Sequence, residues 1–170
     1  MEDDRDARRR FIEDAGNLMD EHALPHMAGK VIGALLICVP PHMALDELAE
    51  ELQASKGAIS MATRLLLRIG ILEKVSLPGH RRRYYRIRPN LWEELFVRST
   101  EHFERHVRLV EEGLEIMRHE PIEMRRRLVE MKAFTDFLAD ELPGLVERWR
   151  KRRPGLVKRS LEKLKEEDRQ

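Results

Sequence analysis

The sequence predicts a mainly α-helical fold with one small β-hairpin, in which a compact N-terminal part is followed by long helices. Two observations lead to this prediction. Apolar residues recur every three or four positions through residues 8–69 and again after residue 90, which is the spacing of amphipathic helices. Between these stretches, residues 71–88 are rich in β-branched and aromatic side chains around Pro78 and Gly79, a pattern typical of two strands and a turn.

The first two helices are predicted at residues 8–21 and 27–38. The first is amphipathic, with apolar residues on one face and charged residues on the other. The second follows Pro25, contains the run VIGALLICV and is stopped by a pair of prolines at positions 40 and 41. Because this helix is apolar nearly all round, we expect it at the buried centre of the domain.

Two short helices joined by a tight connection come next. Residues 44–52 place apolar side chains at i, i+3, i+4 and i+7, and acidic side chains face outward. Ser55 is a good N-cap for a second helix, which Gly70 closes. Two short helices this close together predict a helix-turn-helix motif.

The helix after Ser55 has an outward face that suits the major groove of DNA. On a helical wheel its apolar residues fall on one side, and the other side is small, polar and basic. Ser60 and Arg64 can hydrogen-bond to base edges or phosphates, and Gly57 removes side-chain bulk where a helix must approach closely. Lys56 lies near the positive start of the helix. The predicted DNA-binding residues of this helix are Ser55, Lys56, Gly57, Ser60, Met61 and Arg64.

A β-hairpin is predicted from the segments ILEKVSL and RRRYYRIR. Its tip carries four consecutive basic residues, which are His80, Arg81, Arg82 and Arg83. Like charges at a hairpin tip repel one another, whereas beside a duplex each can contact a phosphate or enter a narrow minor groove. We interpret the tip as a DNA-contacting wing, and a solvated hairpin without a partner is the alternative.

These elements, in this order, resemble a known family. The segments SKGAIS and GILEKVSLPGHRRRYY, within a resemblance that covers roughly residues 11–88, are similar to the winged-helix domain of GbsR-type regulators, a branch of the MarR superfamily. The resemblance implies a winged helix-turn-helix fold and a bacterial, homodimeric transcriptional regulator. It also assigns the wing role to the four basic residues of the hairpin tip and the recognition role to Ser55, Lys56, Gly57, Ser60 and Arg64. Ala44 departs from the pattern, because such sequences often carry a serine or threonine cap there, and its loss costs about 1 kcal/mol of helix stability.

Two long helical patterns follow Pro89. Pro121 interrupts the first, and the second reaches Trp149 with a kink or break expected at Pro143. Their near-heptad apolar stripes need a partner, so we predict a two-fold homodimer, with the first helix of the chain packed alongside. A hairpin of helices within a monomer is the alternative. The predicted interface residues are Trp92, Phe96, Phe103, Val110, Leu114, Leu128, Met131, Leu138 and Leu142.

Three regions are therefore expected: a winged helix-turn-helix DNA-binding region at residues 1–88, a helical dimerisation region at 89–153, and a charged C-terminal tail or short helix at 154–170. The predicted function is sequence-specific binding of double-stranded DNA to regulate transcription, most simply as a repressor. Two-fold symmetry predicts an inverted-repeat operator with half-sites about one helical turn apart. A winged-helix module that docks an acidic protein partner is the alternative.

Composition argues against other classes. The net charge is only +1, so the basic residues matter through their clustering in the hairpin rather than through the total. No run approaches the roughly 20 apolar residues of a membrane span, and the N-terminus lacks a signal-peptide pattern, so a cytoplasmic location is expected. We find no phosphate-cradling glycine loop and no nucleophile with a base, which predicts neither an enzyme nor a bound cofactor.

Four weaker signals have simpler interpretations. Cys38, the single cysteine, is interpreted as a small buried hydrophobe rather than a redox switch. His102 and His106 are four residues apart, but the zincin pattern needs a glutamate after the first, so no metal is predicted. The arginine runs at 125–127 and 148–153 are interpreted as solvated helix faces, with a secondary phosphate contact as the alternative.

An aromatic stripe in the first long helix raises the question of a small-molecule effector. Trp92, Phe96 and Phe103 could line a pocket between the winged domain and the long helices. The resemblance to GbsR-type proteins makes a quaternary ammonium ligand conceivable through cation–π contact. Such a stripe is more often part of a core, so the effector and its identity stay open.

Overall fold

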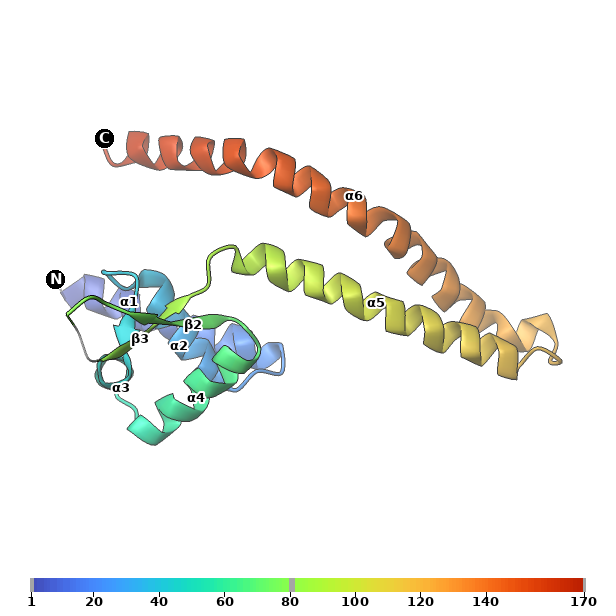
Figure 1. Ribbon diagram of the computed structural model, residues 1–170, viewed down its shortest axis with the longest axis horizontal. Coiled ribbons are helices and arrows are strands. Elements are labelled where there is room, and N and C mark those ends of the chain that lie inside the picture. Colours follow the sequence, from blue (N-terminus) through green and yellow to red (C-terminus); the bar gives the residue numbers. More distant parts are fainter. Residues whose placement is uncertain (1, 80–81, 170) are drawn as a thin grey trace. The chain divides into compact units, whose positions relative to one another are not determined.

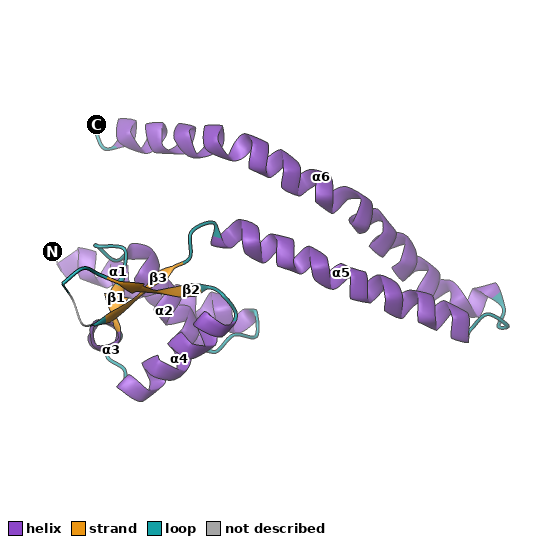
Figure 2. Cartoon of the chain, viewed as in Figure 1, coloured by secondary structure: helices purple, strands orange, loops and turns teal. Residues whose placement is uncertain are grey.

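The structure is a computed structural model that describes residues 2–79 and 82–169, with side chains for residues 4–79, 82–97 and 105–169. The helices are α1 (Glu2–Glu21), α2 (His26–Ile37), α3 (Leu45–Glu51), α4 (Lys56–Arg68), α5 (Leu91–Ile116) and α6 (Ile122–Glu167), and the strands are β1 (Met43–Ala44), β2 (Leu72–Ser76) and β3 (Arg83–Ile87) (Figure 1). They form two compact units, Met1–Leu91 and Trp92–Gln170. The predicted fold class, mainly α-helical with a small antiparallel sheet, is confirmed (Figure 2).

The core of the first unit is built around α2, which is buried along most of its length, as its apolar sequence predicts. One face of α2 packs against α1 at very short range. A Cβ atom added at Gly29 would lie 2.5 Å from the carbonyl oxygen of Ala15, so only glycine allows the two helices to approach this closely. Another face of α2 contacts α4, and Ile59 and Leu66 of α4 are fully buried.

The two short helices are capped in different ways. Ser55 Oγ accepts a hydrogen bond from the backbone N–H of Ala58 at 3.2 Å and caps α4, as predicted. At the start of α3, the side chain of Glu47 accepts a hydrogen bond from the Ala44 N–H at 2.7 Å. This bond is the glutamate half of a capping box, and it offsets part of the stability that Ala44 was expected to cost.

The sheet has the strand order β1-β3-β2, and both pairs are antiparallel. The predicted hairpin is β2 and β3, in which Ser76 lies opposite Arg83 at the loop end. The sequence did not predict β1, because a strand of two residues shows no alternation. Its pairing with β3 fixes the start of α3 beside the hairpin, since Met43 lies opposite Tyr85.

The second unit is a hairpin of α5 and α6. Near the connecting turn, a Cβ atom at Gly113 would lie 3.1 Å from the side chain of Leu128, so the helices touch there. At the other end, Arg150 Nε lies 2.7 Å from Glu93 Oε1, so α6 reaches the first turns of α5 and then continues past them.

At Pro143, where a kink or break was expected, the helix is not broken. Helix α6 runs through both Pro143 and Pro154 to Glu167 and curves gently (Figure 1), so residues 154–167 continue α6 rather than forming a separate short helix or a tail. A proline removes one backbone hydrogen bond, and the carbonyls that lose a partner here belong to the exposed residues Ala139 and Arg150. Water can hydrate these carbonyls, and curvature relieves the ring clash.

Among the residues that the structure describes, none of the helices combines the length and the apolar character that a bilayer crossing requires.

Candidate nucleic-acid interface

Helix α4 presents one buried and one exposed face. Ile59, Ala62 and Leu66 are buried against the core. On the opposite face Met61 is 66% exposed, and Arg64 is also exposed. The Nε of Arg64 donates to the carbonyl oxygen of Ser60 at 3.1 Å, which holds the arginine along its own helix. The exposed face therefore combines an apolar side chain with a cation, two side-chain types that can contact base edges in a major groove.

Gly57 lies in the first turn of α4, and no steric contact within the fold requires a glycine there. Apart from the chain neighbours and the backbone of the helix itself, Ser55 Oγ is the only described atom within 4 Å of a Cβ placed at this position, and at 3.9 Å it leaves room for alanine. The backbone is helical, so no special conformation calls for glycine either. The space that Gly57 leaves open lies at an exposed helix start, where a phosphate or base edge could approach the backbone.

The wing supplies further positive charge. Arg82 and Arg83 are exposed at the end of the hairpin loop, whereas His80 and Arg81 lie outside the described residues. Not every arginine of the hairpin adds to this charge: Arg86 pairs with Glu73 directly across β2 and β3. The positive patch is therefore concentrated at the loop end of the wing.

One acidic residue lies between the cations of α4 and those of the wing. Asp46, in the first turn of α3, forms an ion pair with Lys56, in which Lys56 Nζ lies 2.7 Å from Asp46 Oδ1. The hydrogen bond from Lys56, with the charges of Lys56 and Arg82, holds the pKa of the Asp46 carboxyl below its ordinary value. Sequence reasoning placed Asp46 only on a solvated face, because its contact with a residue ten positions away depends on the turn between α3 and α4.

The predicted dimer residues occupy different environments in the single chain. Val110 is buried within it and so contributes to the hairpin core itself. Trp92 and Phe96 are exposed, and the side chain of Phe103 lies outside the described residues. The remaining predicted residues are half-buried, and they are Leu114, Leu128, Met131, Leu138 and Leu142. Helices α5 and α6 thus form a hairpin within one chain, and this hairpin leaves apolar residues such as Trp92 and Phe96 exposed to solvent.

A pocket of about 240 Å³ lies between the first turns of α5 and the middle of α6. It is lined by Trp92, Glu93, Phe96, Leu145, Val146 and Trp149. Hydrogen bonds from Arg150 and then Trp149 lower the pKa of Glu93, with the charges of Arg150 and Arg153 acting in the same direction. Two of the three aromatic residues considered for an effector pocket, Trp92 and Phe96, therefore line a pocket, but its lining comes from α5 and α6 and not from the winged domain. Helix α6 adds a second tryptophan, Trp149, that the sequence stripe did not reveal.

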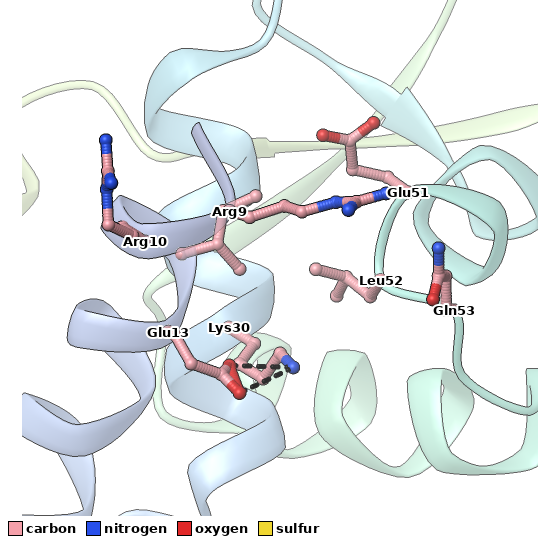
Figure 3. Close-up of a pocket in the computed structure, with 8 residues that line it drawn as sticks. Arg9, Arg10, Glu13, Lys30, Glu51, Leu52 and Gln53 are labelled. Carbon is pink, nitrogen blue, oxygen red and sulfur yellow. Dashed lines mark hydrogen bonds and ion pairs between the residues drawn. The ribbon is translucent and has the colours of Figure 1, made fainter. Parts of the chain in front are cut away.

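A second hollow, of about 310 Å³, lies in the first unit between α1, α2 and the end of α3 (Figure 3). Arg9 and Arg10 of α1 and Glu51 at the end of α3 line it, beside an ion pair between Lys30 Nζ and Glu13 Oε2 at 2.8 Å. Because charges of both signs surround this hollow, we assign it no ligand. The hydrogen bond from Lys30 lowers the pKa of Glu13, and His26, 3.7 Å away, adds to the effect.

Cys38 is half-buried at the end of α2, and its thiol donates to the carbonyl oxygen of Leu35 at 3.5 Å. Burial raises the pKa of this thiol, which keeps it in its less reactive protonated form. Among the described residues, no group of three or more histidine, cysteine or acidic side chains is arranged to hold a metal ion.

A helix-turn-helix motif followed by a basic β-hairpin defines the winged-helix class of DNA-binding folds. Comparisons with known proteins agree with this class. The family described as MmpR5-like MarR family transcriptional regulators matches residues 90–152. The HTH-type transcriptional regulator MmpR5 of Mycobacterium tuberculosis strain H37Rv is 31% identical over 145 residues, which cover 84% of this chain and 86% of that protein.

One solved structure agrees with a transcriptional regulator of this fold. A crystal structure of a transcriptional regulator is 29% identical, with a TM-score of 0.70, and covers 86% of this chain and 99% of that chain. MepR, a transcription regulator of the Staphylococcus aureus multidrug efflux pump MepA, matches with 12% identity and a TM-score of 0.40, too distant to bear on the assignment. The chain belongs to the MmpR5-like MarR family of transcriptional regulators. The resemblance to the MarR superfamily is confirmed, whereas the GbsR-type branch stays a prediction.

Proposed function

We propose that this chain binds double-stranded DNA as a two-fold homodimer and represses transcription from an inverted-repeat operator. Helix α4 would lie in the major groove, where Ser60, Met61 and Arg64 read bases, and the wing would contact phosphates or the minor groove. The C2 symmetry would place two copies of α4 in successive major grooves. A regulator that reads the genome in this way acts in the cytoplasm.

The observation that carries this proposal is the exposed face of α4. Lys56, Gly57 and Arg64 combine positive charge with open space, although none of them is needed to bury the core. The charge of Arg82 in the wing helps to lower the pKa of Asp46, the partner of Lys56, which supports treating the wing and the start of α4 as one charged surface. A protein-docking module would need the basic wing but has no use for the small residues of α4.

Support for the dimer comes from the apolar side chains that a single chain leaves in water. On α6, Met124, Phe134 and Phe137 are each 59% exposed, and Ile122 is 56% exposed. Large apolar side chains left this exposed on a helical hairpin are typical of a protein interface. The second copy of the chain would cover these residues together with Trp92 and Phe96.

An effector remains a further proposal. The apolar pocket beside Trp92 and Trp149 could hold an organic molecule whose binding shifts the distance between the two copies of α4. The GbsR-type resemblance of the winged region would suit a quaternary ammonium compound, but Arg150 and Arg153 near Glu93 disfavour a cation there. We therefore leave the class of effector open.

A binding-site selection tests the proposal. Purified full-length protein is mixed with random-sequence duplexes and with sheared genomic DNA, and the retained fragments are sequenced over several rounds. We expect an inverted repeat with half-sites about one turn apart, and binding that weakens steeply as salt rises. A lone half-site is expected to bind poorly.

Two results would contradict the proposal. Retention that does not depend on salt would argue against contacts with the DNA backbone. Salt-dependent retention without any enriched sequence would leave a non-specific DNA-binding protein and would remove the operator.

A further inference from the structure

The last turns of α6 extend beyond the end of α5. Helix α5 begins at Leu91, and Arg150 of α6 already pairs with Glu93, so residues 154–167 of α6, here named the arm, pass the start of α5 (Figure 1). Apolar residues recur along the arm at helical spacing. They are exposed in the single chain, Val157 by 46%, Leu161 by 53% and Leu164 by 55%.

The arm has little intrinsic reason to stay helical by itself. It opens with Pro154 and Gly155, the two residue types that disfavour a helix interior most strongly. Its ion pairs, Lys158–Glu162 and Lys163–Glu167, are exposed, with nitrogen–oxygen distances of 3.8 and 3.7 Å, and pairs of this kind add little stability. Short isolated helices are marginal in water, so packing on the apolar stripe is needed to hold the arm in shape.

A second exposed apolar patch lies on the same helix. Phe134 and Phe137 are each 59% exposed. Helix α6 is continuous from Ile122 to Glu167, so Phe137 and Val157 lie about 30 Å apart along its axis. The arm therefore cannot fold back onto the phenylalanines of its own chain, and both apolar surfaces need cover from another molecule.

We infer that the arm docks on Phe134 and Phe137 of a second copy, in an antiparallel pair of α6 helices. The inference rests on the homodimer of the proposed function and names the contact that closes it. A two-fold axis near Glu147 places Phe137 of each copy opposite Val157 of the other. One symmetry operation thus covers both arms and both phenylalanine patches, and such a contact closes with two copies.

The charges along α6 favour the antiparallel direction. About the same axis, Arg127 of one copy lies opposite Glu167 of the other, and Glu141 lies opposite Arg153. A parallel pair would instead place the arginine run 125–127 against its own copy, and likewise the basic run 150–153. Because opposite charges across an interface favour a register and like charges oppose it, the pairing that covers the apolar residues also suits these charges.

Disulfide trapping tests this arrangement. Phe137→Cys and Val157→Cys are introduced together into full-length protein that carries Cys38→Ser, and the thiols are oxidised at micromolar concentration. We expect a covalent dimer on a denaturing gel. The two cysteines cannot bond within one chain, because about 30 Å of helix separates them.

Each single-cysteine variant is a matched control. In the antiparallel pair the two copies of residue 137 lie about 30 Å apart along the helices, and so do the two copies of residue 157. Neither variant should therefore form a covalent dimer. In a parallel pair each cysteine would meet its own equivalent, so efficient crosslinking of the single variants would indicate the opposite direction.

Charge reversal provides a measurement that keeps the apolar residues intact. Arg127→Glu would face Glu167 of the partner and should weaken the dimer about threefold or more in sedimentation at low salt. Adding Glu167→Arg should restore the parent affinity, since the pair is then re-formed with its charges exchanged. Circular dichroism of each variant checks that the helices are retained.

Sedimentation of the parent protein distinguishes this inference from the proposed function. In a parent that is a dimer, the antiparallel arm is overturned by absent crosslinking of the cysteine pair, by crosslinking of the single cysteines, or by a failure of Glu167→Arg to rescue Arg127→Glu. A parent that is a monomer removes the dimer of the proposed function, and the arm contact with it.

Discussion

Arg64 and Arg82 carry the same charge, but their surroundings suit different tasks. Arg64 is held along α4 by its bond to Ser60, on the face that would enter the major groove. Arg82 lies at the end of the hairpin loop, and its charge helps to lower the pKa of Asp46. An ordered arginine on a groove-facing helix can read a base, whereas an arginine on a loop serves better as a contact to the backbone.

Replacing each arginine with alanine should therefore have different effects on DNA binding. Arg64→Ala should cost about 1–3 kcal/mol on the operator and relax the preference at one base pair. Arg82→Ala should weaken binding to all sequences alike and reduce the salt slope by about one. Titrations of the operator and of its single-base variants at several salt concentrations measure both effects.

The control for this pair is Arg126→Ala, because Arg126 is exposed on α6 and pairs with Glu130 away from the winged unit. If Arg64→Ala and Arg82→Ala both bind the operator as the parent does, the assigned surface is wrong.

Glu13 provides a pH-dependent contribution to stability. Its pKa is lowered in the folded protein, chiefly by the hydrogen bond from Lys30. A carboxyl group with a lowered pKa stabilises the fold above its ordinary pKa, and this contribution is lost as the pH falls through the lowered value. Because the pair is half-exposed, Glu13→Gln should reduce the free energy of unfolding by less than about 1 kcal/mol at pH 7.

Urea unfolding at pH 7, 5 and 3.5 tests this prediction. The difference between Glu13→Gln and the parent should shrink toward the acid end of the series, since the contribution of Glu13 is lost as the pH falls below the ordinary pKa of a glutamate and through the lowered pKa of Glu13. Asp14→Asn, an exposed substitution on the same helix, is the control. A difference that grows in acid would contradict the assigned direction of the shift.

At the scale of elements, α4 has two separable requirements: it must be capped, and, for the proposed DNA binding, the cap itself should add no negative charge to the interface. Ser55 meets both, because its hydroxyl caps the helix without charge. The capping preference was readable from the sequence, since it depends on one residue type at one position. The ion pair of Lys56 with Asp46 could not be predicted from the sequence, since it depends on how α3 and α4 are oriented.

Two substitutions at Ser55 separate these requirements. Ser55→Ala should lower the free energy of unfolding by about 1 kcal/mol, because the Ala58 N–H loses its acceptor. Ser55→Asp should restore the cap and the stability, yet weaken DNA binding, because it adds a negative charge to the proposed interface. Chemical denaturation and a DNA titration of both variants provide the two measurements. Equal DNA binding by Ser55→Asp and the parent would place the start of α4 outside the interface.

Helix α6 illustrates where a local rule gave the wrong element boundary. Prolines at 143 and 154 favour a break when each is considered alone, and the expected tail followed from that rule. The helix continues because the affected carbonyls lie on an exposed surface and because contacts with α5, from Leu128 to Arg150, hold it on both sides of Pro143.

For the molecule as a whole, the open question is what covers the apolar side chains of α5 and α6. Phe134 and Phe137 are one helical turn apart and are largely exposed in the single chain. If the second copy covers them, Phe134→Asp combined with Phe137→Asp should produce a folded monomer, because each charged residue would have to be buried without a partner in the dimer. The variant should also lose affinity for the inverted repeat, since one winged unit contacts one half-site.

Sedimentation at micromolar concentration measures the change in mass, and circular dichroism checks that the helices remain. The matched control carries leucine at both positions, which keeps the apolar surface and should leave the dimer intact. A parent protein that sediments as a monomer would remove the dimer from the proposal altogether.

The sequence alone determined the features that depend on local spacing and residue type. Helical periodicity, the Ser55 cap and the hairpin around Gly79 predicted the helices, the helix-turn-helix and the two main strands, because each follows from steric and hydrogen-bonding preferences within a few residues. Tertiary structure decided what depends on distant contacts. The strand β1 against β3, the Asp46–Lys56 pair, the burial of Val110 and the second tryptophan beside Trp92 all arise where separate segments meet, and no spacing rule within one segment records them.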